Sequence, residues 1–189
     1  MSRFLRFRFL IGLVCLSATL LASSPHALAD TIGVRSADLR LEDDTYVLNA
    51  EFDFALNPTL EEALQKGVPL YFVLEFELRR PRWYWFDEKL ISLSIQYRVS
   101  YDVLTEKYRV GTGLLSIHLD SLEEVERLVS RVAARPVARK DELVAGARYE
   151  ARVRLRLDVT QLPKPFQLNA LGSRDWSLQS DWYGWSVVP

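Results

Sequence analysis

The stretch Leu70-Tyr71-Phe72-Val73-Leu74-Glu75-Phe76-Glu77-Leu78-Arg79 carries only Leu and Phe at its even-numbered positions. Successive side chains of a β-strand point to opposite faces, so this pattern predicts a strand with one continuous apolar face. The opposite face begins apolar, at Tyr71 and Val73, and becomes charged from Glu75 onward. We therefore expect that face to be covered at its start and exposed to water from Glu75 to Arg79.

The same two-residue period appears on both sides of this stretch and predicts further strands. The segments that show it are 32–41, 46–56, 91–101 and 149–159. In the first of them the apolar positions change phase, which indicates a β-bulge near Ser36. The acidic run Glu42-Asp43-Asp44 that follows predicts a turn. We expect a loop over 133–146, with a short strand at Val137, and one or two short strands in the tail 176–188.

Two short helices are expected because capping residues mark their ends. Asn57 can accept hydrogen bonds from the free amides of a helix that begins at Pro58 and ends at Gly67. The run Ser121-Leu122-Glu123-Glu124 is a capping box, with Ser at the cap and Glu three residues later. The prolines of Pro163-Lys164-Pro165 are expected to end regular structure after the last long strand.

These elements favour a mainly β fold. Six to eight strands and two short helices in one domain are typical of a single-domain antiparallel β-sandwich, immunoglobulin-like in kind. The alternative is an α+β fold with both helices on one face of the sheet. The apolar strand faces also predict a shared core, whose members are Phe52, Phe72, Phe76, Ile95 and Leu155.

Residues 1–29 have the features of a secretory signal peptide rather than of a folded element. Three arginines within the first eight residues precede an apolar run over 9–22, which is shorter than the about 20 residues of a membrane span. Ala27-Leu28-Ala29 offers the small residues that signal peptidase requires, so we expect cleavage before Asp30. The expected product is a single β-rich domain over 30–189, located in the periplasm without stable membrane insertion. The alternative is an uncleaved segment that anchors the protein to the inner membrane.

The composition excludes several classes of function. The chain has 189 residues and a formal net charge of −1, and without residues 1–29 it keeps 21 basic and 25 acidic residues, a net charge of −4. Nucleic-acid-binding proteins usually need a basic excess, so we expect no nucleic acid partner. Residues 30–189 contain no Cys, one His and no glycine-rich phosphate-binding motif. We therefore expect no catalytic residues, no metal site and no cofactor, and we interpret His118 as a strand residue with one hydrogen bond.

Three arginines line the polar face of the strand expected over 149–159: Arg152, Arg154 and Arg156. They could bind an anionic polymer, such as lipopolysaccharide or an acidic part of peptidoglycan. The favoured interpretation pairs them with a neighbouring strand, because Glu75 and Glu77 have the same spacing on a charged face. Charged outer faces of this kind are common in antiparallel sheets.

Arginine and aromatic residues interrupt the alternation after Arg79. The candidates for ligand or partner contact in this segment are Arg80, Arg82, Trp83, Tyr84 and Trp85. Exposed aromatic side chains beside arginine can stack on sugar rings or anchor a protein partner. The favoured interpretation is structural, with Trp83–Phe86 packed against the C-terminal tail. The tail tryptophans are Trp176, Trp182 and Trp185.

Several blocks of the sequence resemble one family. They are Asn57-Pro58-Thr59-Leu60-Glu61-Glu62-Ala63-Leu64, Gly67-Val68-Pro69-Leu70-Tyr71-Phe72, Arg80-Pro81-Arg82-Trp83-Tyr84-Trp85, Gln161-Leu162-Pro163-Lys164-Pro165-Phe166-Gln167 with Asn169-Ala170-Leu171, and Ser173-Arg174-Asp175-Trp176 with Ser180-Asp181-Trp182. These blocks are similar to those of a family of uncharacterised exported proteobacterial proteins, the domain of unknown function 4390 (DUF4390). The resemblance covers nearly all of residues 30–189. It implies export and a single domain, and it implies no activity, ligand or catalytic residue.

The sequence therefore favours a non-enzymatic binding or interaction module of the cell envelope. Its expected partner is an envelope or inner-membrane protein. The alternative is a carbohydrate- or glycan-binding domain that uses the Trp clusters. A hydrolase built on carboxylates is the least favoured hypothesis, because the acidic pairs are adjacent in sequence and point apart, whereas glycoside hydrolysis needs two carboxylates facing each other across a cleft.

Overall fold

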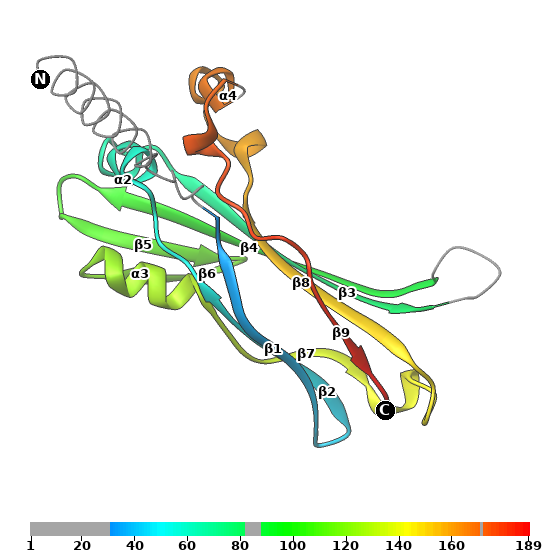
Figure 1. Ribbon diagram of the computed structural model, residues 1–189. Coiled ribbons are helices and arrows are strands. Elements are labelled where there is room, and N and C mark those ends of the chain that lie inside the picture. Colours follow the sequence, from blue (N-terminus) through cyan, green and yellow to red (C-terminus); the bar gives the residue numbers. More distant parts are fainter. Residues whose placement is uncertain (1–30, 82–87, 171) are drawn as a thin grey trace, which may run out of the picture.

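The structure is a computed structural model that describes residues 31–81, 88–170 and 172–189 (Figure 1). Within these residues nine strands form two antiparallel sheets, one in the order β1-β2-β7 and one in the order β6-β5-β4-β3-β8-β9. The strands are β1 (Gly33–Glu42), β2 (Thr45–Asp53), β3 (Leu70–Arg80), β4 (Glu88–Asp102), β5 (Lys107–Thr112), β6 (Leu115–Leu119), β7 (Arg131–Arg139), β8 (Tyr149–Leu157) and β9 (Tyr183–Val187). This mainly β, sandwich-like fold confirms the prediction.

The stretch 70–79 lies in β3, at the centre of the six-stranded sheet between β4 and β8. Its five even-numbered side chains are fully buried, as the alternation predicts. The predicted core is confirmed, because one buried cluster contains all its members: Phe52, Phe72, Phe76, Ile95 and Leu155. On the opposite face of β3, Val73 is buried and Tyr71 is half-buried, so the start of that face is covered as expected.

The three-stranded sheet begins with a tight hairpin. Asp43 and Asp44, between β1 and β2, both have positive φ angles, of 44° and 62°. Two-residue hairpin turns of type I′ require this left-handed backbone at both positions because it matches the twist of the strands, and Asp tolerates it. The predicted bulge is also confirmed, since the pairing of β1 with β2 shifts register between Val34 and Ser36.

Strand β7 occupies the first half of the loop expected over 133–146, so the prediction of a loop was wrong there, while the short strand expected at Val137 is part of β7. Six of its nine residues pair with β2, and the register shifts twice, between Tyr46 and Val47 and between Leu48 and Ala50. Ala134 has a positive φ of 47°, and Pro136 cannot donate a backbone hydrogen bond. These irregularities are tolerated because β7 is an edge strand, and they erase the alternation by which a strand is detected.

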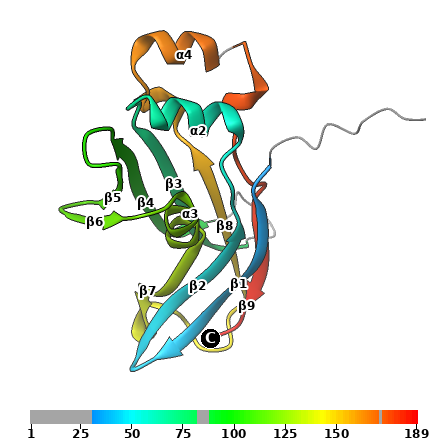
Figure 2. The ribbon, with the colours of Figure 1, turned by 90° about the vertical axis from the view of Figure 1, so that its left-hand side faces the viewer.

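Two helices form where the caps predict them. Helix α2 (Pro58–Gln65) begins after Asn57, whose Oδ1 accepts a hydrogen bond of 2.9 Å from the Leu60 amide. Helix α3 (Leu122–Val129) begins after Ser121, which accepts from the Glu124 amide at 3.3 Å. Helix α3 packs between the β5–β6 hairpin and β7 (Figure 2). The two helices therefore help to close the core between the sheets.

A further helix, α4 (Lys164–Ala170), begins where Pro163 and Pro165 were expected to end regular structure. Pro165 occupies the first turn, where a backbone N–H has no partner within the helix, so proline is tolerated there. Phe166 of α4 packs on Trp176, with 5.6 Å between ring centres. In the described part of the chain, three 3-10 turns also connect the elements: η2 (Lys140–Glu142), η3 (Val159–Gln161) and η4 (Arg174–Trp176). Within the described residues no helix is both long and apolar enough to cross a membrane.

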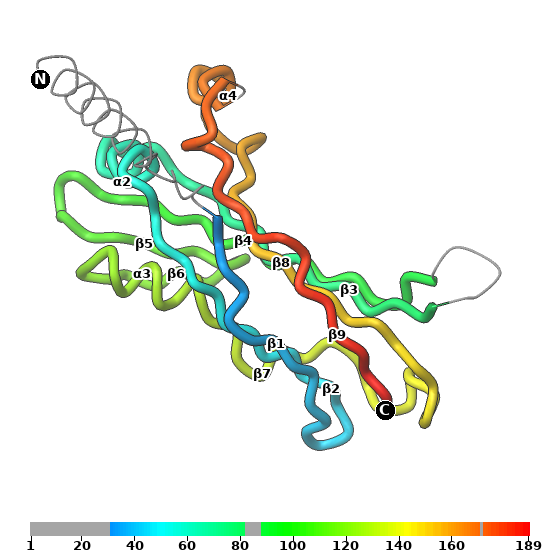
Figure 3. The backbone as a smooth tube through the Cα atoms, in the orientation of Figure 1, coloured from blue at the N-terminus to red at the C-terminus, as the bar shows by residue number. Residues whose placement is uncertain are grey.

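The C-terminal tail connects the two sheets. It runs along β8 and ends in β9, which confirms that the tail contains a short strand (Figure 3). Gln179 bridges to Arg156 in the six-stranded sheet and to Thr31, which lies just before β1 of the other sheet. The Ile32 amide donates a hydrogen bond of 3.1 Å to the Gln179 carbonyl. The ends of the described fold therefore meet at one seam.

Candidate functional site

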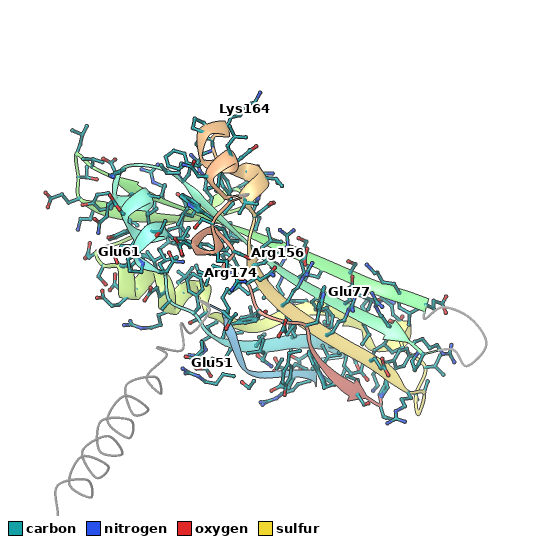
Figure 4. All side chains as sticks on the ribbon, turned by 45° about the horizontal axis from the view of Figure 1, so that its top comes forward. Glu51, Glu61, Glu77, Arg156, Lys164 and Arg174 are labelled. Atoms are coloured by element: carbon teal, nitrogen blue, oxygen red, sulfur yellow. The ribbon has the colours of Figure 1, made fainter. Side chains whose placement is uncertain are left out.

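The arginine row lies on the outer face of the six-stranded sheet, where β8 pairs with β3. The register places Arg154 opposite Glu75 and Arg152 opposite Glu77, as the spacing predicts. Arg152 Nε donates to Glu77 at 2.8 Å, and Arg154 Nε donates to the Glu75 carboxylate. Arg156 Nη2 also donates to Glu75, at 3.2 Å, and Glu77 and Arg156 are labelled in Figure 4. The favoured pairing of the arginines with the β3 glutamates is confirmed.

Glu77 is the centre of this network and differs from its prediction. The residue is 8% exposed rather than wet, because Arg79, Lys89 and Arg152 surround its carboxylate. Burial alone would raise the pKa of Glu77. Hydrogen bonds from the three cations more than offset that effect and lower the pKa to about 2. Glu77 is therefore charged throughout the physiological range.

Glu75 shows the same balance in a more open position. Burial raises its pKa, but hydrogen bonds from Arg154 and Arg156 lower it by more, so the net shift is downward. Asp158 adds a carboxylate at the end of the row, 3.6 Å from Arg156 Nη1. Among the described residues, this network joins five cations and three carboxylates: Arg79, Lys89, Arg152, Arg154 and Arg156, with Glu75, Glu77 and Asp158. The network therefore carries an excess of positive charge.

Trp182 from the tail covers part of this network. The guanidinium carbons of Arg152 and Arg154 lie 4.1 Å and 4.5 Å from the centre of its ring, within the range of cation–π contacts. The tail is fixed just before this point, because Ser180 Oγ accepts a hydrogen bond of 3.0 Å from the Leu155 amide. Neighbouring hydrogen bonds therefore hold Trp182 and both arginines in a defined layer on the sheet.

A shallow hollow of about 530 Å³ adjoins the network at the β8–β9 edge. Arg79, Arg152 and Glu150 form its charged side, and Trp185 and Ser186 of β9 form its rim. Trp185 is half-buried and lies 6.2 Å from Phe76 and 6.0 Å from Tyr183, measured between ring centres. The hollow therefore combines two cations and one carboxylate with an aromatic edge.

The other residues predicted to contact a ligand or partner are either separate from this network or outside the described part of the chain. Arg80 ends β3 opposite Glu88 and is exposed. Arg82, Trp83, Tyr84 and Trp85 lie outside the described residues, and so does the predicted packing of Trp83–Phe86 on the tail. Of the predicted partners in the tail, Trp176 is buried.

Two arginines escaped the sequence analysis, Arg98 on β4 and Arg109 on β5. They lie on the same outer face as the arginine row, at the other end of the sheet, beside the β5–β6 hairpin. His118 lies opposite Arg109 in β6 and accepts a hydrogen bond of 3.1 Å from Arg109 Nε, which confirms its predicted role. The alternation of apolar and polar residues could have identified Arg98, because Arg98 falls on the polar face of the strand predicted over 91–101.

The described residues contain no group of three or more His, Cys, Asp or Glu side chains that could hold a metal ion. A comparison with protein families matches residues 29–186 to the family described as a domain of unknown function (DUF4390). The chain belongs to this family. The match confirms the resemblance seen in the sequence blocks, and the DUF4390 description itself names no activity. Neither curated proteins nor solved structures gave a match to this DUF4390 chain.

Proposed function

We propose that this chain is a non-enzymatic binding or interaction module of the cell envelope, exported to the periplasm. Its binding surface is the outer face of β3 and β8 with Trp182. The observation that carries the proposal is the excess of cations over carboxylates in the network around Glu75 and Glu77. An envelope or inner-membrane protein with a complementary acidic surface is the partner that this charge favours.

The geometry of the arginines supports binding as well as stability. Arg152 and Arg154 are held against Trp182 and by carboxylates, so little side-chain freedom remains to be lost when a partner binds. Within the described residues, Arg154 reaches Glu75 through Nε, which leaves its terminal Nη groups for another acceptor. Guanidinium groups presented in this way suit the planar carboxylates of Asp and Glu side chains.

The tail tryptophans support the glycan-binding alternative less well. Sugar stacking needs a free aromatic face, but Trp176 is buried and Trp185 packs beside Phe76. The ring of Trp182 already carries two guanidinium groups. In the described part of the chain, an acidic partner therefore fits better than a sugar.

The carboxylates of the surface favour a non-enzymatic role. A general base works best with a pKa near the working pH, and the pKa of Glu77 is about 2. The pKa of Glu75 is lowered as well. Both side chains are therefore weak bases whose main effect is to position the arginines.

Affinity capture from a cell-envelope extract tests the proposal, with the tagged protein and its Arg154→Gln and Glu75→Gln variants as baits. Arg154→Gln should capture less of an acidic partner, while Glu75→Gln, which leaves more positive charge on the surface, should capture as much or more. Arg35→Gln is a matched control, because Arg35 forms a similar cross-strand pair with Glu51 on the other sheet. Equal capture by all four proteins would overturn the assignment of this surface.

A further inference from the structure

The turn between β5 and β6 presents apolar side chains to solvent. Gly113 has a positive φ of 60°, which lets the chain reverse tightly and point Leu114 outward. Leu114 is fully exposed, Leu115 is 77% exposed and Ile117 is 51% exposed. The hairpin lies at one margin of the molecule in Figure 2. A cluster of exposed leucines on a projecting turn usually marks a contact site.

Two arginines stand beside this turn. Arg98 pairs with Gly111 and Arg109 pairs with Ser100, so the two lie on adjacent strands and on the same face. A groove of about 380 Å³ joins them to the turn, with Leu114, Leu115 and Ser116 in its wall. Cationic, hydroxyl and apolar groups therefore meet in one place.

These arginines differ from the row on β8 because, among the described residues, neither forms an ion pair with a carboxylate. The Arg98 guanidinium lies 6.0 Å from the centre of the Tyr71 ring. Arg109 uses Nε to reach His118. The nearby Asp102 accepts from the amides of Leu104 and Thr105 in the β4–β5 turn. The terminal guanidinium groups of Arg98 and Arg109 are thus available to an external anion.

We propose that the β5–β6 hairpin docks on an anionic lipid bilayer. Leu114 and Leu115 enter the interfacial region, and Arg98 and Arg109 pair with headgroup phosphates. This role goes beyond the proposed function and uses none of the residues of the β8 network. This combination strengthens peripheral membrane contact, since burial of apolar side chains and attraction to anionic headgroups add to each other.

The apolar turn distinguishes a bilayer from a free phosphate. A phosphate ion would engage the arginines but would give no reason for a fully exposed leucine at the same site. The interface of a bilayer also needs no shaped pocket, which agrees with a Leu114 side chain that stands clear of the rest of the chain.

A site-specific fluorescence measurement tests this proposal on the full chain. An environment-sensitive dye is attached to Leu114→Cys in a Cys15→Ser background, and vesicles of phosphatidylcholine with or without phosphatidylglycerol are added. Leu104→Cys is the matched control, because Leu104 is 96% exposed in the β4–β5 turn. The dye at position 114 should shift to shorter wavelength with the anionic vesicles only, while the dye at position 104 should not shift. An unchanged spectrum at 114, or an equal shift at 104, would overturn the proposal.

The arginines are tested in the same assay. Arg98→Gln with Arg109→Gln should weaken binding to the phosphatidylglycerol vesicles about thirtyfold, since each of the two neutralised cations near such a surface loses about 1 kcal/mol and 1.4 kcal/mol is a factor of ten. The double variant Arg131→Gln with Arg148→Gln removes two exposed arginines elsewhere and should behave like the parent. Soluble glycerol phosphate distinguishes the other source of phosphate: if it competes fully with the vesicles, the site binds a free headgroup and bilayer docking is wrong. Arg154→Gln should leave the shift unchanged, so failure here is separate from failure of the proposed function.

Discussion

Glu77 shows how a charged side chain can be buried without a loss of stability. Three cations contact its carboxylate, and its folded pKa of about 2 lies well below the ordinary value of glutamate. Because the folded pKa is lowered, the charged form stabilises the fold above about pH 5, and that stabilisation is lost as the pH falls toward 2. The pairing of β8 with β3 thus depends on the protonation state of this residue.

We predict that Glu77→Gln lowers the free energy of unfolding by about 3 kcal/mol at pH 7, since the shift exceeds two pKa units. Urea denaturation at several pH values measures this effect. The difference between the two proteins should shrink as the pH falls from about 5 toward 2. Glu51→Gln is the control, because its pair with Arg35 is exposed and should contribute less than about 1 kcal/mol. A difference that stays constant with pH would contradict the ion-pair explanation.

We also predict that Phe76→Ala costs about 3–5 kcal/mol, because its side chain is fully buried and packs beside Trp185. The midpoint of urea unfolding should fall, with little change in the slope of the transition. Leu104→Ala, at an exposed turn, should leave the midpoint nearly unchanged. If Phe76→Ala behaves in the same way as Leu104→Ala, the face of β3 has been assigned wrongly.

At the scale of elements, the sequence predicts the strands and helices that depend on a local pattern. It does not predict those that depend on contacts with distant segments. The alternation of apolar and polar residues predicts β3, β8 and the ion pairs between them, because residues two positions apart in a strand share a face. It misses β7, where pairing with β2 overrides an irregular backbone, and α4, where Pro165 begins the helix instead of preventing it. Trp182 could not be placed over Arg152 from sequence, because the path of the tail depends on the fixed position of Ser180.

Asn57 joins two elements, and a pair of substitutions separates its roles. Its Oδ1 caps α2, and its Nδ2 donates a hydrogen bond of 2.7 Å to the Asp175 carbonyl in the tail. We predict that Asn57→Ala, which removes both contacts, lowers the free energy of unfolding by about 2 kcal/mol. Asn57→Ser keeps a capping oxygen but is too short to reach Asp175, so it should cost about half as much. Thermal unfolding measures both, and equal losses would mean that the cap contributes little.

At the scale of the whole molecule, the C-terminal tail is an integral part of the fold. Trp176, Leu178 and Ser180 are buried, and β9 completes one edge of the larger sheet. We predict that truncation after Arg174 leaves the protein unfolded or aggregated, because it exposes core surface and removes the bridge at Gln179. Circular dichroism and melting experiments test this. A truncated protein with an unchanged melting temperature would show that the tail is a separate element.

The expected route of export gives a second prediction at this scale. Cleavage before Asp30 should yield a protein in the periplasmic fraction that begins at Asp30. Intact mass spectrometry of that fraction measures its N-terminus directly. A mass that retains Met1, or a protein found with the inner membrane, would instead favour the uncleaved anchor.

The seam at Gln179 has a consequence for the timing of folding. The bridge from Gln179 to Thr31 joins residues far apart in the described chain, so this link between the two sheets is added to their shared core only when the tail is available. Contacts between such distant residues make folding slow, because a long loop must close before they form. In a chain emerging from the ribosome, this bridge therefore cannot form before Gln179 has been synthesised. For the export that we propose, this delay is favourable, because a translocation channel accepts only unfolded chains.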